Sequence, residues 1–104
     1  MNDIAKTIER EVLSWSGVTA EPHRFGGIEF RVNQREIGHL HGDYLADLPF
    51  PVRDRQELVT AGAQPHHIYP NSGWVSYYIQ GTADVPSVVE LFRRNYQRLT
   101  SVLR

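Results

Sequence analysis

Cysteine is absent from this 104-residue sequence, and its absence excludes several kinds of chemistry at once. Without thiols there are no disulfides, no thiol nucleophile and no zinc–thiolate site. Long apolar runs are also absent, so the sequence predicts no membrane span. The first residues lack the basic segment followed by an apolar segment that marks a signal peptide. We therefore expect a cytoplasmic protein without a membrane partner.

Lysine is almost absent as well, because the eleven basic residues are ten arginines and Lys6. The formal net charge is −1 when the histidines are neutral. Proteins that bind nucleic acid usually carry a basic surface patch, because most of their affinity comes from lysine and arginine side chains that neutralise the phosphates. The composition therefore argues against a nucleic-acid partner. We attribute the preference for arginine to codon usage rather than to a binding site.

Apolar residues at helical spacing predict three helices. Ile4, Ile8 and Val12 recur every four residues, which favours a helix over residues 3–15. A short helix is predicted over residues 54–61, and a long final helix is predicted to begin at Asp84. The expected buried stripe of the final helix consists of Val85, Val88, Val89, Phe92, Tyr96, Leu99 and Leu103.

Between the helices the apolar period changes to two, which is typical of half-buried strands. The predicted strands cover residues 21–25, 28–33, 36–41, 66–69 and 74–79. The last of these is apolar on both faces, so we expect it to be central in the sheet. We also expect Trp74 and Tyr96 to be largely buried. The sequence thus predicts one α+β domain over residues 1–104. Its mainly antiparallel sheet packs against N- and C-terminal helices, with a short middle helix between strands.

Four of the five histidines lie in two short segments, residues 38–43 and 65–70. His39 and His41 are two residues apart on a predicted strand, so they project from one face, and Asp43 continues that parity if the strand persists past Gly42. His66 and His67 point to opposite faces if extended, so at most one would join the same site. Three ligands from two strands would suit Zn²⁺, Ni²⁺ or Fe²⁺ with an open position.

We therefore expect the two histidine segments to meet. The predicted set of metal ligands is His39, His41 and His67. The alternative interpretation is structural: the histidines tie strand ends to loops through hydrogen bonds.

Two arginines suggest a second kind of site. Arg53 and Arg55 lie at the start of the short predicted helix and, with His66 and His67, could form a cationic pocket for a small anionic ligand. The simpler explanation, which we favour, is that these arginines form surface ion pairs with Asp47, Asp54 or Glu57. Candidate residues for general acid–base chemistry are Glu29, Glu36, Asp43 and Asp47.

Five short motifs resemble a small bacterial and fungal family, the luciferase-domain proteins. The motifs are residues 25–30, 38–43, 47–49, 65–67 and 72–75. The resemblance implies no light-emitting reaction, because nothing in the sequence indicates a flavin or luciferin site.

A second resemblance concerns the C-terminal half, where Trp74, the acidic residue before the last helix and Asn95-Tyr96 are similar to MmcQ/YjbR-like proteins. That family is a compact α+β domain, also described as a double-wing DNA-binding fold.

These observations give two functional hypotheses. The leading one is a small-ligand or metal-binding domain. Its predicted site contains His39, His41, Asp43, His66 and His67. The alternative is a DNA- or protein-binding interaction module of the double-wing type. No motif in the sequence assigns a reaction, a ligand or an oligomeric state.

Overall fold

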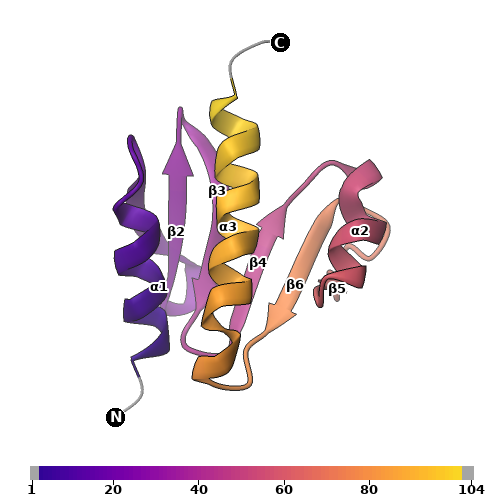
Figure 1. The fold of residues 1–104 in the computed structure, drawn as a ribbon, viewed down its shortest axis with the longest axis horizontal. Coiled ribbons are helices and arrows are strands. Elements are labelled where there is room, and N and C mark those ends of the chain that lie inside the picture. Colours follow the sequence, from indigo (N-terminus) through magenta and orange to yellow (C-terminus); the bar gives the residue numbers. More distant parts are fainter. Residues whose placement is uncertain (1–2, 102–104) are drawn as a thin grey trace.

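The computed structural model describes residues 3–101, in which six antiparallel strands form one sheet (Figure 1). The strand order is β1-β2-β3-β4-β6-β5. The helices are α1 (Ile4–Leu13), α2 (Arg55–Thr60) and α3 (Val85–Thr100). The strands are β1 (Thr19–His23), β2 (Gly27–Val32), β3 (Arg35–His41), β4 (Leu45–Pro49), β5 (Gln64–Pro65) and β6 (Trp74–Tyr78). The predicted α+β class with an antiparallel sheet is confirmed.

One face of the sheet, here called the inner face, packs against the helices. In Figure 1, α1 and α3 lie side by side over it. Ile8 of α1, Leu58 of α2 and Phe92 of α3 are completely buried in the same core as Phe30 of β2. Phe30 and Phe92 meet edge to face, with ring centroids 5.5 Å apart. Burial of this apolar area is the main stabilising contribution to the fold.

The predicted stripe of the last helix is confirmed in its central part. Val88, Phe92 and Leu99 are buried, and Val85, Val89 and Tyr96 pack against the core while partly exposed. Leu103 lies outside the described residues. Within residues 3–101, no helix is at once long enough and apolar enough to cross a membrane.

A β-bulge interrupts strict alternation in β3. Phe30 pairs with Gly38 and Arg31 pairs with Glu36, so Ile37 is an extra residue with no partner across β2. Because of this insertion, Glu36 and His39 come to the same face although they are three residues apart. The carbonyl of Ile37 accepts a hydrogen bond from Nδ2 of the buried Asn95, at 2.8 Å.

Glycine is required next to the bulge because α3 and β4 approach the backbone closely. A Cβ atom at Gly38 would lie 2.8 Å from the Leu48 side chain and 2.9 Å from the ring of Phe92. Both neighbours are buried core residues, so a larger side chain would push β3 away from α3.

The other face of the sheet, here called the outer face, carries a polar row. Glu29 pairs with His39, His39 with Asp47, and Asp47 with Ser76. Directly paired residues of antiparallel strands project to the same side, so these four side chains line up across the middle of the sheet. This row is the foundation of the candidate site.

One prediction about strands was wrong. Residues 66–69 are not a strand, because the backbone N–H groups of Ile68 and Tyr69 donate to Nδ1 of His66 and are not available to pair with another strand. The strand predicted at 74–79 corresponds to β6, which lies inside the sheet between β4 and the two-residue edge strand β5.

Two aromatic residues that were expected to be largely buried are buried only in part. Trp74 is only half-buried, because it faces the histidines of the outer face rather than the core. Tyr96 is half-buried because its hydroxyl group reaches the surface, where it donates to the Ser16 carbonyl at 2.7 Å.

Candidate metal centre

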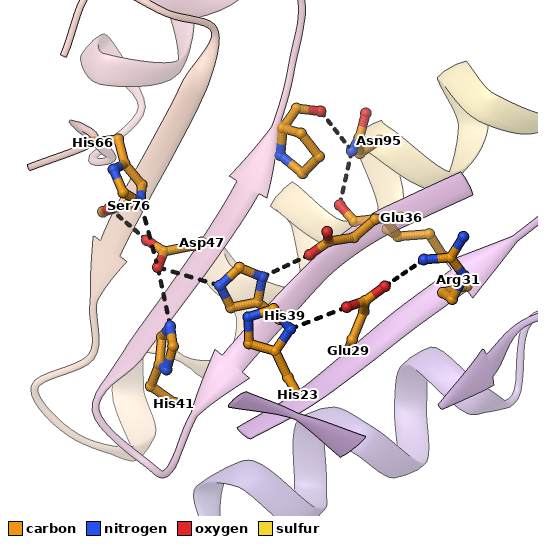
Figure 2. Close-up of polar contacts among 12 residues, drawn as sticks. His23, Glu29, Arg31, Glu36, His39, His41, Asp47, His66, Ser76 and Asn95 are labelled. Carbon is orange, nitrogen blue, oxygen red and sulfur yellow. Dashed lines mark hydrogen bonds and ion pairs between the residues drawn. The ribbon is translucent and has the colours of Figure 1, made fainter. Parts of the chain in front are cut away.

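Asp47 is the centre of the site. It lies on β4 between β3 and β6, and it is only 2% exposed. Its Oδ1 accepts a hydrogen bond from the Ser76 hydroxyl at 2.5 Å. Its Oδ2 faces the Nε2 atoms of His41 at 3.2 Å, His39 at 3.5 Å and His66 at 3.7 Å (Figure 2). Three imidazoles from two separate segments therefore converge on one buried carboxylate oxygen.

His39, His41 and Asp47 form a group that could hold a metal ion. Their potential ligand atoms all lie within 4.8 Å of one another. Two atoms that bind one tetrahedral ion at ~2.0–2.1 Å lie roughly 3.3 Å apart. The separations from Asp47 Oδ2 to His41 Nε2 and His39 Nε2, 3.2 and 3.5 Å, bracket that value. The carboxylate thus has the spacing of a metal ligand relative to each of the two imidazoles.

His39 is oriented by Glu36. Nδ1 of the imidazole hydrogen-bonds to Glu36 Oε2 at 2.6 Å, which leaves Nε2 directed toward Asp47. A ligating histidine commonly donates its other ring N–H to a carboxylate in this way, which fixes its tautomer and its orientation. Glu36 can reach His39 because of the bulge at Ile37.

His23 supports His39 from β1, which β2 separates from β3. The two imidazole rings stack with centroids 3.9 Å apart and an interplanar angle of 17°. Nδ1 of His23 contacts Glu29 Oε1 at 3.0 Å, and Glu29 also accepts a hydrogen bond from Arg31. His23 thus belongs to the same polar network, and Figure 2 shows it beside His39.

His66 contributes a hydrogen-bond donor rather than a metal ligand. Its Nδ1 accepts from two backbone N–H groups, those of Ile68 at 3.1 Å and Tyr69 at 3.3 Å. In the neutral ring the proton must then reside on Nε2, the atom that faces Asp47. An Nε2 that carries a proton cannot bind a metal, so His66 presents an N–H to the centre of the site.

The pKa values of His39 and Asp47 are shifted in opposite directions. Burial by itself lowers the pKa of His39, but hydrogen bonds to Asp47 and Glu36 outweigh it and raise the pKa to about 9. Burial by itself would raise the pKa of Asp47, but hydrogen bonds with His39 and Ser76 outweigh that effect and lower it. Without a metal, His39 is therefore an imidazolium held between two carboxylates at neutral pH.

The two other histidines around Asp47 behave differently. The pKa of His41 is lowered, first by burial and then by the positive charge of His39. The pKa of His66 is lowered too, chiefly by burial, despite the attraction of Asp47. Both side chains are thus neutral at pH 7, and the neutral form is the one that lets His41 bind a metal.

A pocket of about 560 Å³ opens above this cluster. His39, His41 and Asp47 lie in its deeper part, and Trp74 forms part of its wall. Its rim includes three exposed apolar or aromatic side chains, Tyr44, Ile68 and Tyr69. The remaining lining residues are His23, Arg24, Glu36, Leu45, His66 and His67. All five histidines of the chain line this one pocket.

The predicted meeting of the two histidine segments is confirmed, since His66 shares Asp47 with His39 and His41. His67 lines the pocket, and its ring stacks on His66 with centroids 4.6 Å apart. It does not belong to the group of convergent ligand atoms, in which Asp47 takes the place that the sequence prediction gave to His67. The reason is that residues 66–69 are not extended.

The prediction that Asp43 continues the parity of His39 and His41 was wrong. β3 ends at His41, and Gly42 adopts a φ of +55° that turns the chain. Oδ1 of Asp43 instead accepts a hydrogen bond from the backbone N–H of Ala5, at 2.7 Å. Asp43 therefore stabilises the N-terminus of α1 and does not line the pocket.

The structure does not bring Arg53 and Arg55 to the histidines. Neither lines the pocket, and Arg55 donates to the carbonyl groups of Pro70 and Ser72, both at 3.0 Å. Arg55 thus anchors the loop that follows His66. A ligand-binding role for either arginine stays a prediction.

Two arginines on the surface of α3, Arg93 and Arg94, have ion-pair partners within the chain. Arg93 forms ion pairs with Glu11 and Glu90, and Arg94 forms one with Glu57. The DNA- or protein-binding alternative also stays a prediction.

Sequence reasoning missed the roles of three residues in this site. His23 lies in β1, far in sequence from the other histidines, and Glu36 needed the bulge to reach His39. Asp47 was a candidate acid or base only. One signal could have found it: a lone carboxylate in the apolar run Leu45-Ala46-Asp47-Leu48, on a strand that pairs with β3.

Comparison with known proteins gives one match. The family model described as "Luciferase domain" matches residues 34–95, which is more than half of the chain, so the chain belongs to the luciferase-domain family. No curated protein and no solved structure matches the chain. The predicted likeness to MmcQ/YjbR-like proteins is therefore not confirmed.

Proposed function

We propose that this luciferase-domain protein binds a divalent transition-metal ion through Nε2 of His39, Nε2 of His41 and the carboxylate of Asp47. The observation that carries the proposal is the convergence of these atoms at 3.2 and 3.5 Å in a buried position. Two imidazoles and a carboxylate whose ligand atoms lie this close together can bind one ion in common.

The donor set suits particular metals. Two imidazoles and one carboxylate bind Zn²⁺ or Fe²⁺ in many proteins and leave at least one coordination position open. An ion held here would supply Lewis acidity and would lower the pKa of a bound water. The N–H of His66 lies beside these ligands, 3.7 Å from Asp47 Oδ2, where it can donate to a molecule in the open position.

The hydrogen bonds around the ligands support the same proposal. Glu36 holds the Nδ1 side of His39, and Ser76 holds the second oxygen of Asp47. Such outer partners position metal ligands and contribute to metal affinity. Among the described residues, no buried side-chain nitrogen or oxygen lacks a hydrogen-bond partner. The cluster is thus preorganised rather than assembled by the ion.

The proposal is tested by metal analysis of protein purified without a histidine tag, followed by calorimetric titration of the chelator-treated protein with Zn²⁺. We expect one ion per chain. Asp47→Asn and the double variant His39→Ala/His41→Ala should each weaken binding at least about a hundredfold, roughly the loss of one or more metal bonds.

Two variants serve as controls, and circular dichroism checks that every variant folds. Asp43→Asn alters a carboxylate on the same chain segment that lies outside the cluster, and His67→Gln alters a pocket histidine outside the donor set. Both should bind Zn²⁺ like the wild type. Equal binding by Asp47→Asn would contradict the proposal, and a loss in His67→Gln would restore the ligand set predicted from sequence.

A further inference from the structure

We infer that the pocket takes a small amphipathic monoanion: an aromatic or alicyclic carboxylate whose anionic group lies at the metal end and whose ring lies against the rim. This inference names the ligand class of the proposed metal site and therefore rests on the proposed function. Three observations carry it: the apolar rim, the charge balance of the lining and the size of the pocket.

The rim is unusually apolar for an exposed surface. Tyr44 is 61% exposed, Ile68 61% and Tyr69 58%, and all three line the same pocket. In the part of the chain that the structure describes, the only other exposed large hydrophobic residues are Leu13, Val52 and Tyr78, and each is less exposed than these three. Half of the exposed large apolar side chains are thus gathered at one opening. Clustered exposed apolar groups mark places where an apolar ligand is bound.

Trp74 extends this apolar surface toward the metal end. Its ring lies 5.7 Å from that of His39 and 6.0 Å from that of His66, measured between centroids. A planar ring that enters the pocket would contact Trp74 on the way from the rim to the ligands of the ion. Aromatic rings stack favourably on one another, so a cyclic body fits this path better than a flexible chain does.

The charges of the lining favour a single negative charge. The carboxylates of Asp47 and Glu36 together cancel the charge of a divalent ion, which leaves the guanidinium of Arg24 unbalanced. Arg24 is exposed, and its guanidinium forms no hydrogen bond or ion pair with the side chains that the structure describes. A carboxylate can bind an open position of the ion or form a bidentate pair with an arginine.

The size of the pocket sets the scale of the ligand. A volume of about 560 Å³ lies within the usual range of small-molecule sites. It exceeds what an acetate-sized anion would fill, so binding should depend on the apolar body as well as on the charge.

The test uses 2-naphthoate, its neutral isostere 2-naphthamide, and acetate, each titrated calorimetrically into Zn²⁺-loaded and metal-free protein. We expect 2-naphthoate to bind the Zn²⁺-loaded protein at least about tenfold more tightly than either other compound. Ile68→Ala, Tyr69→Ala and Arg24→Gln should each weaken 2-naphthoate several-fold. The matched control is Val52→Ala, which removes a side chain that is 55% exposed and lies outside the pocket, and it should not change the affinity.

The outcomes separate this inference from the proposed function. If Zn²⁺ binds but naphthoate, naphthamide and acetate bind equally or not at all, the ligand class is wrong and the metal site stands. If Zn²⁺ does not bind, the proposed function fails, and naphthoate bound by the metal-free protein through Arg24 would still support an amphipathic anion site. If the three pocket variants bind naphthoate like Val52→Ala, the compound binds elsewhere and the inference is overturned.

Discussion

The two faces of the sheet are made by the same strands and differ completely in what their side chains do. On the inner face Phe30, Leu48 and Val75 are completely buried in the core beneath the helices. On the outer face Asp47, which precedes Leu48 on β4, and its partner His39 on β3 take part in a polar network. The inner face supplies stability by apolar burial, whereas the outer face positions charged groups that the fold does not need for its core.

The two faces meet at one point, the bulge in β3. Asn95 of the inner layer donates from Nδ2 to the carbonyl of Ile37 at 2.8 Å and to that of Pro49 at 2.9 Å. Its Oδ1 accepts from Nε of Arg98 at 2.8 Å. The bulge in turn sets where Glu36 and His39 project. A substitution on the inner face should therefore change the stability of the fold without changing its affinity for Zn²⁺. Asn95 is the exception, because its substitution should change both.

The largest expected effect is on the inner face. Phe92→Ala removes a completely buried ring, so we expect a loss of ~3–5 kcal/mol in the free energy of unfolding. Urea denaturation followed by circular dichroism measures this loss. The fraction that remains folded should keep its affinity for Zn²⁺, because the ring does not line the pocket. A large drop in affinity would show that the faces are not separable.

The next effect concerns pH and the outer face. The folded pKa of His39, about 9, lies above its ordinary value of 6.5, so the fold binds this proton more tightly than the unfolded chain does. The resulting stabilisation, ~3 kcal/mol, is complete below about pH 6.5 and is lost as the pH rises through 9. Metal-free wild type should therefore lose urea resistance between about pH 6.5 and 9.5, whereas His39→Gln should not.

The same measurement below pH 6.5 tests the protonation of His41 and His66. The lowered pKa values of His41 and His66 mean that the fold favours their neutral forms. Their contribution is present above about pH 6.5 and is lost as the pH falls below it. The metal-free protein should therefore be most stable near pH 6.5. A stability that is flat from pH 5 to 9.5 would contradict the charge assignment of the cluster.

Asn95→Leu should give a somewhat smaller loss of stability, ~2–3 kcal/mol, because it leaves the carbonyls of Ile37 and Pro49 without their buried donor. Unlike Phe92→Ala, it should also weaken Zn²⁺ binding, since the bulge then no longer fixes Glu36 and His39. Calorimetric titration of both variants makes the comparison, with Phe92→Ala as the control for lost stability. Equal affinities would show that the bulge does not depend on Asn95.

The smallest effect is expected at Asp43, which lies in the turn after β3 and binds the N-terminus of α1. Asp43→Asn weakens the hydrogen bond to the N–H of Ala5 and removes a negative charge from the N-terminus of α1. We expect a loss of ~0.5–1 kcal/mol, measured by urea denaturation at low salt. A loss that persists unchanged at high salt would show that the weakened hydrogen bond, and not the lost charge, is its cause.

The inner face was largely predictable from the sequence, and the outer face only in part. The period of Ile4, Ile8 and Val12 predicted α1 because one apolar stripe must face the core. The alternation of His39 and His41 likewise predicted their common face. Both predictions depend only on the spacing of neighbouring residues along the chain.

The rest of the site depends on register, which local spacing does not determine. Asp47 faces His39 because β3 and β4 pair with those residues opposite each other, and Glu36 reaches His39 because one extra residue is inserted in β3. His66 reaches the site from a loop that is held by the hydrogen bond from the N–H of Ile68 to His66 Nδ1. Each feature follows from contacts between segments distant in sequence, and so a periodic pattern could not predict it.

The central claim is tested most directly by locating the ion. Crystals of the tag-free protein grown with Zn²⁺ and measured at the zinc absorption edge give an anomalous peak at each bound ion. The account predicts one peak within about 2.0–2.2 Å of His39 Nε2, His41 Nε2 and a carboxylate oxygen of Asp47, with an open position toward the pocket. A peak bound only by other residues, or none beside Asp47 at saturating Zn²⁺, would contradict it.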